Sequence, residues 1–454
     1  MNKLTLKHSL MKSKKPQVLG LFCFVTSLLL TDVIWAQEAA DNTFNLGLNT
    51  LSRGELRYGG FQESDPTVEG LSNFVLGRYR LTAEYMHGSW LETKLSIQQS
   101  GVWGQAQSNI NLYEGWALLK SKNGLFAKFG RQELAYDDER ILGPDDWTMA
   151  AYTHDMLKLG YEGNLHKVHL MLAYNQNPSN MNGQTYYTGG NQPYKTMQNL
   201  WYHYDAPTFP LGVSLLFMNI GMQNEDQDHP KTYFQQLAGT YLSFMPKSWS
   251  VEGAFYYQMG TEEHALPLRA YMGSVKIDVH PHENYSIFTG YDYLSGDKYF
   301  AIPPNGAIGL TYHNVIRGFN PIYGSHHEFY GAMDFYYVST YVDGFTPGLQ
   351  NLYLGGSYKP IENLNLTTNL HYLAITSDLP LVKKTLGYEI EFTATYDPND
   401  FISLECGYSF MKGTKTMMTL KRVSDDQQLH WVYLMVVFSP RLFYTSWQDK
   451  VENK

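Results

Sequence analysis

Apolar and polar residues alternate along short stretches of this chain from Phe44 to Phe438. The alternation is clearest at 364–372 and 386–397, where every second residue is apolar apart from Thr368. Successive side chains leave a β-strand on opposite faces, so each stretch predicts a strand with one apolar and one polar face. A water-soluble β-sandwich would show the same alternation, and the alternation alone leaves both architectures open.

Eighteen stretches of this kind predict eighteen strands. They lie near residues 44–58, 74–88, 90–104, 111–120, 125–134, 154–162, 166–176, 197–205, 211–220, 232–244, 249–260, 269–280, 285–296, 348–359, 364–376, 385–397, 402–412 and 429–439. The number is even, as it is in single-chain bacterial outer-membrane barrels.

The connections between these stretches fall into two length classes. Short connections lie at 87–89, 121–124, 163–165, 206–210, 245–248, 281–284, 360–363 and 397–401, and longer ones at 59–73, 135–153, 178–196, 221–231, 297–347 and 413–428. The short ones are rich in Gly, Pro, Asn and Asp, which favour tight turns. Because a soluble sandwich has no reason to sort its loops, we predict an all-β transmembrane antiparallel barrel with short periplasmic turns and long extracellular loops.

The N-terminus has the pattern of a secretory signal peptide. A lysine-rich start is followed by the apolar run 18–30 and by Ala36, after which cleavage would leave Gln37 as the first residue. The apolar run is too short to cross a bilayer as a helix. We therefore expect residues 1–36 to be removed and residues 37–454 to form one barrel domain in the outer membrane.

Composition supports an exported barrel. Aromatic residues make up 15% of the chain, with 36 tyrosines, and such residues form girdles at the two membrane interfaces. Removing residues 1–36 takes away five lysines and one aspartate and lowers the formal net charge from −9 to about −13, which disfavours nucleic-acid binding. Cys23 lies in the signal segment, so the mature chain has only Cys406 and no internal disulfide.

One part of the chain resembles a known family. The core of the alginate-export porin family is similar to the run 129–143 (FGRQELAYDDERILG), to Trp147 and to the run 154–159 (HDMLKL). Further similarity extends to 78–81 (RYRL), to Tyr113 and Glu114, and to 326–335 (HHEFYGAMDF). The resemblance implies an eighteen-stranded outer-membrane barrel that passes polar or anionic solutes, with loops folded into the lumen.

The polar faces of the predicted strands separate charge by sign. If apolar residues face lipid, the early strands turn four anions inward, Glu55, Glu84, Glu92 and Glu114, and a larger basic wall of seven cations, namely Arg53, Arg57, Arg78, Arg80, Lys94, Lys128 and Lys158. The later strands turn one cation inward, Lys276, and an acidic wall of six anions, namely Glu252, Asp278, Asp292, Glu389, Glu391 and Glu405. We hypothesise a transverse field across the pore that orients dipolar solutes, because strong ion selectivity comes instead from rings of a single sign. For any single residue, the competing interpretation is an ion pair that braces the wall.

The acidic wall bears on the solute. An alginate exporter needs cationic partners along its path, because a polyuronate carries one carboxylate per sugar. We therefore predict a porin with a water-filled pore for passive passage of small polar or charged solutes or oligosaccharides. An exporter of an anionic polysaccharide such as alginate is the alternative. A secreted glycan-binding β-protein, with aromatic platforms on an exposed sheet, is a further alternative.

The loop after the strand near 125–134 carries a charged run, Asp137, Asp138, Glu139 and Arg140, followed by Asp145 and Asp146. This run predicts either a constriction loop folded into the lumen or a salt-bridged surface loop. Arg131 falls on the lipid-facing set of the preceding strand, where an arginine at the bilayer midplane costs about 2–4 kcal/mol. We therefore expect Arg131 to lie near a rim or to be redirected by a β-bulge.

The connection 297–347 is too long to be a simple link between strands. Its aromatic residues are Phe319, Tyr323, Phe329, Tyr330, Phe335, Tyr336 and Tyr337. An exposed loop rarely carries so many, so we expect this one to pack into the barrel mouth. No metal or other cofactor is expected, because neither His326, His327 and Glu328 nor the acidic segment 225–228 has a strong ligand pattern.

Enzyme signatures do not occur in the sequence. It contains neither a G-x-S-x-G elbow nor the zinc-protease spacing H-E-x-x-H, and His169, His203 and His371 lie on polar faces without an obvious paired serine. We predict no enzymatic activity. The expected partners are outer-membrane lipid and small polar or anionic solutes or oligosaccharides. The particular solute, the direction of passage and the oligomeric state are left open.

Overall fold

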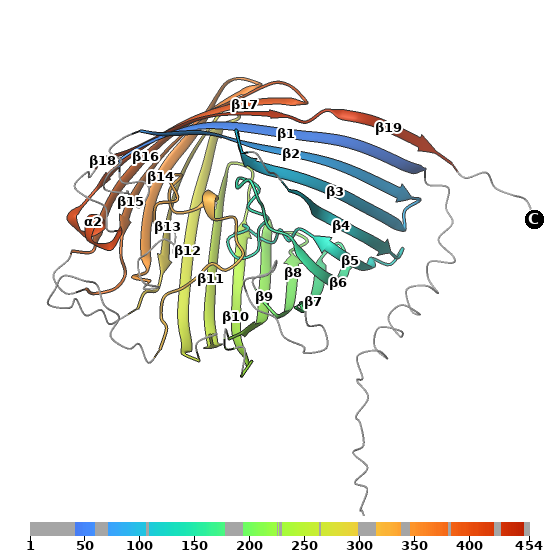
Figure 1. Ribbon diagram of the computed structural model, residues 1–454, viewed down its shortest axis with the longest axis horizontal. Coiled ribbons are helices and arrows are strands. Elements are labelled where there is room, and N and C mark those ends of the chain that lie inside the picture. The colour runs from blue at the N-terminus through green and yellow to red at the C-terminus, as the bar shows by residue number, and fades with distance from the viewer. Residues whose placement is uncertain are drawn as a thin grey trace, which may run out of the picture.

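The computed structural model of the chain is a closed antiparallel β-barrel (Figure 1). It describes residues 41–59, 71–105, 109–177, 194–224, 226, 229–262, 265–297, 315–336, 346–379, 383–421 and 428–448. The predicted signal peptide, residues 1–36, lies outside the described residues. No helix in the described ranges is long and apolar enough to cross a membrane.

The strands follow one another around the barrel in chain order. They are β1 (Asn42–Tyr58), β2 (Ser72–His87), β3 (Leu91–Val102), β4 (Ile110–Lys120), β5 (Leu125–Gln132), β6 (His154–Glu162), β7 (His166–Tyr174), β8 (Thr196–Asp205), β9 (Leu211–Gln223), β10 (Thr232–Phe244), β11 (Trp249–Thr261), β12 (Pro267–His282), β13 (Tyr285–Leu294), β14 (Leu349–Ile361), β15 (Leu364–Ala374), β16 (Thr385–Asn399), β17 (Ile402–Gly413), β18 (Gln428–Phe438) and β19 (Arg441–Trp447). From β1 to β18 each strand pairs with the next, and β1 pairs with both β18 and β19 to close the sheet.

The strands β18 and β19 together occupy one strand position in the barrel. Residues 50–58 of β1 pair with β18, and residues 42–47 of β1 pair with β19. The interruption falls at Pro440, which has no backbone N–H to give to the ladder. The barrel therefore has eighteen strand positions, which confirms the predicted number of strands and the predicted fold class. The strand β19, which follows Pro440, is an addition to the predicted stretches.

The connections sort by length between the two rims. One rim, here called the short-turn rim, carries the connections 88–90, 121–124, 163–165, 206–210, 245–248, 283–284, 362–363 and 400–401. The opposite rim, the long-loop rim, carries most of the longer connections, including 133–153 and 295–348. Aromatic pairs gather at the short-turn rim, with Tyr85 and Trp447 stacked at 6.0 Å and Phe209 and Phe244 at 4.7 Å between ring centroids. Such rings suit the interface between lipid and water.

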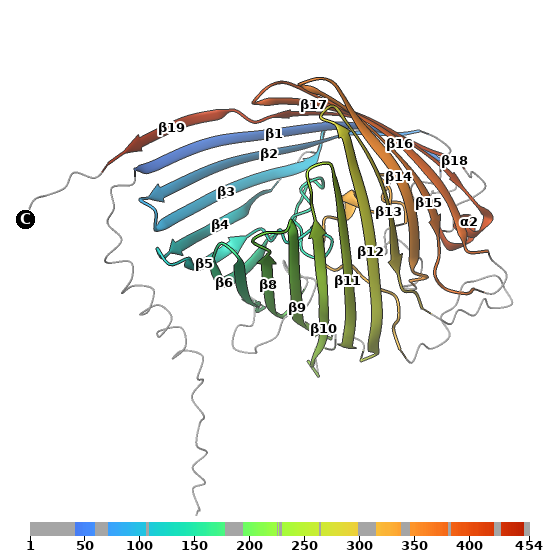
Figure 2. The ribbon, with the colours of Figure 1, turned by 180° about the vertical axis from the view of Figure 1, so that it is seen from behind.

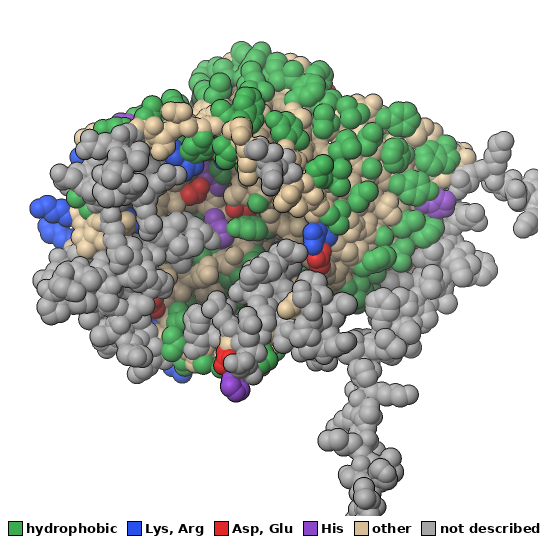
Figure 3. All heavy atoms as spheres, in the orientation of Figure 1, with side chains coloured by type: hydrophobic (Ala, Val, Ile, Leu, Met, Phe, Trp, Pro, Cys, Tyr) green, Lys and Arg blue, Asp and Glu red, His purple; other side chains and the backbone are tan. Residues whose placement is uncertain are grey.

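The outer face of the barrel is apolar. In Figure 3 hydrophobic side chains spread over the outer wall. Leu370 and Phe392 are exposed on this face, whereas their strand neighbours His371 and Glu391 point inward and are buried. A water-soluble protein rarely exposes apolar surface of this extent, so the outer wall is suited to lipid. The secreted glycan-binding alternative does not account for this wall.

The inner face is not polar throughout. Met171, Met197, Met218, Leu237 and Met272 point inward in the half of the barrel nearer the long-loop rim, and all five are fully buried. They belong to one apolar cluster with residues of the infolded loops. Methionine is flexible enough to fill irregular gaps. The rule that apolar residues face lipid therefore fails where the wall has to receive a loop.

Two connections of the long-loop rim fold into the barrel (Figure 2). The first is the β5–β6 loop, residues 133–153. The second is the β13–β14 loop, described over residues 315–336 and containing the 3-10 helix η2 (His326–Glu328). Its predicted mouth-packing residues Phe319, Tyr323, Tyr330, Phe335 and Tyr336 are buried and Phe329 is partly buried, while Tyr337 lies outside the described residues. A short helix, α2 (Lys415–Lys421), follows β17.

Candidate functional site

The β5–β6 loop turns inward directly after β5. Asp137, Glu139, Asp145 and Ala151 have positive φ angles of 56°, 60°, 48° and 54°. Residues other than glycine adopt this region only where their surroundings hold them. Asp137 is held by the Nε1 atom of Trp201 in β8, which donates a hydrogen bond of 3.1 Å to its carboxylate. Of the two sequence alternatives for this charged run, the structure has the loop inside the barrel.

The two infolded loops bind each other. The backbone N–H of Gly143 donates to the carbonyl of Tyr323 at 2.8 Å, and that of Ser325 donates to the carbonyl of Glu139 at 2.9 Å. The hydroxyl of Ser325 also donates to the Glu139 carboxylate at 2.9 Å. Leu142 and Tyr323 form an isolated parallel bridge. The charged run thus sits at the junction of the two loops.

Arg140 is enclosed at this junction. Its guanidinium forms ion pairs with Asp138 at 3.1 Å and with Asp292 of β13 at 3.0 Å. It also donates a 3.2 Å hydrogen bond to the Tyr330 hydroxyl and lies 4.0 Å from the ring centroid of Phe329. Burial by itself lowers the pKa of an arginine, but Asp292, Tyr330 and Asp138 raise the pKa of Arg140 well above its usual value. Arg140 therefore remains charged and ties the loop to the wall.

The far end of the β5–β6 loop is tied to β2 and β3. The Nη1 and Nη2 atoms of Arg78 donate to the two carboxylate oxygens of Asp146 at 2.9 and 3.0 Å. Arg80 donates to the same carboxylate at 2.8 Å. Gln98 of β3 donates to the backbone carbonyl of Met149 at 3.1 Å. The arginines expected to face solute thus hold a loop.

A stack of three side chains extends this contact to β1. Arg53 donates a 3.0 Å hydrogen bond to the carbonyl of Trp147, and its guanidinium lies 4.1 Å from the centroid of the indole ring. His327 of the β13–β14 loop stacks on the same indole at 4.0 Å with an interplanar angle of 2°. Trp147 therefore joins the wall and both loops.

Most of the basic wall is neutralised by nearby carboxylates. Glu55 forms ion pairs with Arg53 at 2.9 Å and with Arg57 at 2.7 Å, and it also accepts a 2.9 Å hydrogen bond from Trp431. Lys94 forms an ion pair with Glu114. With Arg78 and Arg80 engaged by Asp146, the competing interpretation of braced ion pairs describes this part of the wall.

Lys128 and Lys158 differ from the other basic residues. They are direct register partners on β5 and β6, and neither forms an ion pair within the described ranges. The Nζ atom of Lys128 lies 3.8 Å from the ring centroid of Trp116. Both line a cavity of about 300 Å³ near the short-turn rim, together with Lys120 and Glu162. Like charges placed opposite each other destabilise a sheet, so the stability of the sheet does not explain the pair.

Two members of the acidic wall hold the β13–β14 loop. Glu389 accepts a 2.9 Å hydrogen bond from the backbone N–H of Met333, and Glu391 accepts one of 2.6 Å from that of Ala332. The preceding Gly331 has a φ angle of 98°, and a Cβ atom there would lie 2.5 Å from the Glu389 carboxylate. Glycine is therefore the residue that lets the loop approach this wall.

The remaining acidic residues have different surroundings. Glu405 accepts a 2.8 Å hydrogen bond from the Tyr433 hydroxyl, and Asp278 lies 3.5 Å from His280. Glu252 forms no ion pair or hydrogen bond with the described part of the chain. The acidic wall therefore contains loop-holding, wall-bracing and free carboxylates.

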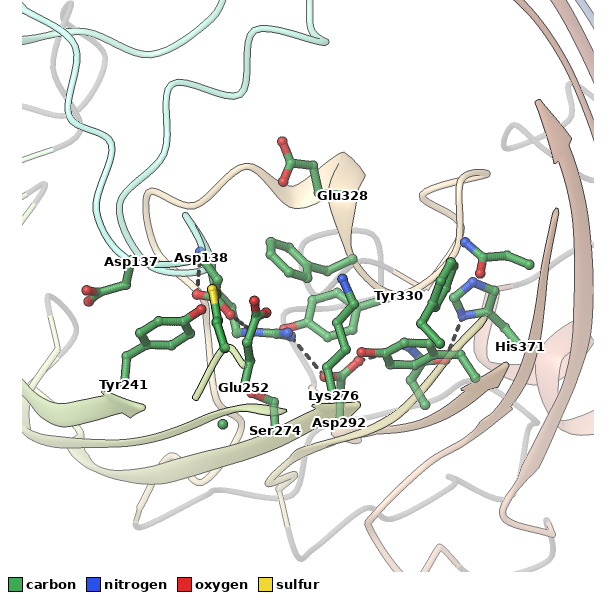
Figure 4. Close-up of a pocket in the computed structure, with 18 residues that line it drawn as sticks. Asp137, Asp138, Tyr241, Glu252, Ser274, Lys276, Asp292, Glu328, Tyr330 and His371 are labelled. Atoms are coloured by element: carbon green, nitrogen blue, oxygen red, sulfur yellow. Dashed lines mark hydrogen bonds and ion pairs between the residues drawn. The ribbon is translucent and has the colours of Figure 1, made fainter. Parts of the chain in front are cut away.

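A cavity of about 460 Å³, here called the vestibule, lies between the infolded loops and the inner face of β10 to β15 (Figure 4). Arg140, Asp138 and Asp292 in its lining are engaged with one another. Glu252 of β11 and Lys276 of β12 also line it and are not. Its aromatic residues are Tyr241, Phe288, Phe329, Tyr330 and Tyr353. Within the described ranges, the vestibule thus combines apolar rings with the free ammonium group of Lys276 and the free carboxylates of Glu252 and Glu328.

Burial changes the protonation of groups in the infolded loops. It raises the pKa of Asp145 to about 6, with Asp334 adding to the effect. It also raises the pKa of Glu328 and lowers the pKa of His326 to about 4. In the described ranges, no three His, Cys, Asp or Glu side chains converge as metal ligands, and His327 instead contacts Asp334 at 2.9 Å.

Arg131 lies on the outer face, one residue before the end of β5. Its guanidinium forms an ion pair with Asp155, its register partner on β6, at 2.7 Å. Of the two alternatives for Arg131, this position fits the one that expected it near a rim. The carboxylate of Asp155 neutralises a charge that lipid would otherwise meet alone.

Sequence reasoning missed the inward aromatic residues of the vestibule. Phe288 and Tyr353 share strand parity with Asp292 and Asn351, which point inward. The signal was therefore present, but assigning apolar residues to lipid concealed it. Asp146 and Trp147 were also missed as contacts of the basic wall, because nothing local in the sequence indicates which wall a loop will meet.

Solved porin structures share this fold. OccK9 (OpdG) of Pseudomonas aeruginosa matches with a TM-score of 0.59 and 14% identity over 88% of this chain and 98% of that chain. OpdL of the same organism matches with a TM-score of 0.59 and 12% identity over 88% and 99%. OccK2 (OpdF), solved in complex with glucuronate, matches with a TM-score of 0.58 and 12% identity over 88% and 98%. No protein-family model and no curated protein matches the chain.

These matches establish the fold, which is that of porin-like barrels. The apolar outer wall and the loop-filled lumen are consistent with that class. The resemblance to the alginate-export family stays a prediction from the sequence.

Proposed function

We propose that this chain is an outer-membrane porin with a water-filled pore for small polar or charged solutes or oligosaccharides. The observation that carries the proposal is the junction of the two infolded loops at Arg140, which narrows a closed barrel from within. Asp137, Asp138, Glu139 and Arg140 serve as the constriction loop in this proposal. Arg140 acts there as a brace, since its guanidinium is already enclosed.

The apolar outer wall and the predicted signal peptide support a location in the outer membrane. A closed barrel satisfies every ladder hydrogen bond internally, which is what lipid requires of a spanning sheet. The predicted signal peptide at 1–36 supports export, and the apolar outer wall supports insertion into the outer membrane. No catalytic role is proposed for any residue.

The transverse-field hypothesis is kept in a restricted form. Within the described ranges, Lys128 and Lys158 on the basic side and Glu252 on the acidic side have neither an ion pair nor a hydrogen bond. The members that form ion pairs contribute little net field, because each lies beside a charge of opposite sign; they are Arg53, Arg57, Arg78, Arg80 and Lys94 on the basic side and Asp292 on the acidic side. We therefore propose weak ion selectivity with a preference for solutes that carry both signs or none.

Passage of an anionic solute is the second candidate. The uncompensated pair Lys128 and Lys158 favours it, and the structurally similar OccK2 is described in complex with glucuronate. Against export of a polyuronate such as alginate, Arg53, Arg78 and Arg80 already have carboxylate partners. A long polyanion would have to compete with these internal pairs.

Single-channel recording of the refolded mature chain in a planar bilayer under a salt gradient tests the proposal. We expect discrete conductance steps with weak ion preference and little block by oligouronates. Strong anion selectivity with block by oligouronates would support the second candidate instead. The absence of any conductance would contradict the porin proposal. Extraction that succeeds only with detergent, followed by a heat-dependent shift in electrophoretic mobility, distinguishes a barrel from a secreted glycan-binding protein.

A further inference from the structure

Glu252 and Lys276 are opposite charges that do not neutralise each other. They are direct register partners on β11 and β12, where opposite charges usually attract across the strands. Yet they form no ion pair with each other, and neither has another ion pair or hydrogen bond in the described ranges. Figure 4 shows both side chains rising into the vestibule, with Glu252 on the side of Tyr241 and Lys276 on the side of Tyr330.

The neighbouring charges leave these two groups available. Arg140, the nearest other cation in the lining, is occupied by Asp138 and Asp292. The ammonium group of Lys276 has only an aromatic neighbour, Phe288, with 5.4 Å between Nζ and the ring centroid. Glu328 of η2 also lines the vestibule without a partner in the described ranges, but Figure 4 shows its carboxylate directed away from the strands. The strands themselves present one acceptor, Glu252, and one donor, Lys276, on neighbours that lie about 4.8 Å apart in a sheet.

Building on the porin proposal, we propose that the vestibule binds a zwitterion, with Glu252 receiving its ammonium group and Lys276 its carboxylate. An α-amino acid carries both groups on one carbon, and their separation suits two side chains on neighbouring strands. An apolar or aromatic amino-acid side chain would then meet Phe288, Tyr241 and Tyr353. A purely anionic or purely cationic solute would leave one of the two charges without a partner. The solute class is therefore amino acids with an apolar side chain.

Three small molecules that share a phenylethyl skeleton and differ in charge test the proposal. Phenylalanine carries both charges, 3-phenylpropionate carries only the carboxylate, and 2-phenylethylamine carries only the ammonium group. Each is added to the refolded full-length mature pore in a planar bilayer, and the concentration that halves the open-channel current is measured. We expect phenylalanine to block at about fivefold lower concentration than either analogue, the factor for one extra exposed ion pair.

Single substitutions separate the two roles. In Glu252→Gln the advantage of phenylalanine over 3-phenylpropionate should vanish, and in Lys276→Gln its advantage over 2-phenylethylamine should vanish. The double exchange E252K/K276E should keep the preference for phenylalanine, because donor and acceptor are merely swapped. Glu84→Gln and Lys167→Gln are matched controls whose side chains do not line the vestibule, and both should behave as the parent pore does.

The outcomes distinguish this inference from the function on which it rests. A pore that conducts but is blocked equally by all three molecules would overturn the zwitterion site and leave the porin proposal intact. A preference for phenylalanine that survives both single substitutions would also overturn it, since the two residues would then only balance each other. The absence of conductance steps in salt alone would instead contradict the porin proposal.

Discussion

Single residues inside this barrel mostly hold other residues in place. Arg78 and Arg80 bind Asp146, and Glu389 and Glu391 bind the backbone of the β13–β14 loop. A buried ion pair is weak evidence for net stability, but removing one partner leaves an uncompensated charge. The inward charges of the walls therefore control the position of the loops before they control solutes.

Arg140 provides the clearest test at this scale. Arg140→Met should release the β5–β6 loop, because Asp138 and the fully enclosed Asp292 would be left without their cation. Breaking a buried pair in this way costs about 3–5 kcal/mol. We expect larger open-channel current noise and faster chymotrypsin cleavage within residues 133–153. Adding Asp292→Asn to the variant should recover part of the loss, and an additive double variant would contradict a direct pair.

Asp145 makes loop docking depend on pH. Its pKa of about 6 in the folded loop lies above the ordinary 3.8, so the docked loop binds a proton more tightly than the free loop. Docking is then most stable below about pH 4, and stability decreases as the pH rises to about 6. The loss is about 3 kcal/mol at most.

Amide hydrogen exchange of residues 139–148, corrected for the intrinsic rate, measures this dependence. Protection should be greater at pH 4.5 than at pH 7.5. Asp145→Asn should remove the difference, because the amide has the same shape and does not titrate. The neighbours Asp334, Asp146 and His327 also face this group, so a dependence that persists in the variant would assign it to them instead.

At the scale of elements, the closure of the barrel depends on the last strand. Residues 42–47 of β1 have β19 as their partner on the closing side, so removing residues 441–454 would expose a strand edge. Unpaired backbone groups are costly in lipid. We expect the truncated chain to lose most of its heat-resistant compact form on unboiled gels. Removing only residues 449–454, which follow β19, is the matched control and should have little effect.

The sequence was most informative about the secondary-structure elements. Each of the eighteen predicted stretches overlaps a strand, because alternation of period two is a local property. The ends were less accurate. β5 ends at Gln132, two residues before the expected position, because the chain turns inward there, and a register shift near Gly387 turns Leu386 into the barrel although its parity assigned it to lipid.

At the scale of the whole molecule, the field in the pore depends on the few charges that remain unpaired. K128Q/K158Q should shift the reversal potential under a salt gradient toward cation preference, because it removes two cations without carboxylate partners. The neutral pair removal K94Q/E114Q is the control and should cause little shift, since these two residues already form an ion pair. Equal shifts in both variants would contradict the proposal that the unpaired charges set the field across the pore.

The sequence by itself determined the barrel, the order of its strands, the division between short and long connections, and the parity of residues such as Arg53 and Glu391. These follow from local periodicity, since each strand reports its own two faces. Only the tertiary structure decided which inward charges are used. Arg140 with Asp292, Arg78 with Asp146 and Ser325 with Glu139 come from distant parts of the chain. Their pairing depends on where an infolded loop meets the wall, and no local pattern carries that information.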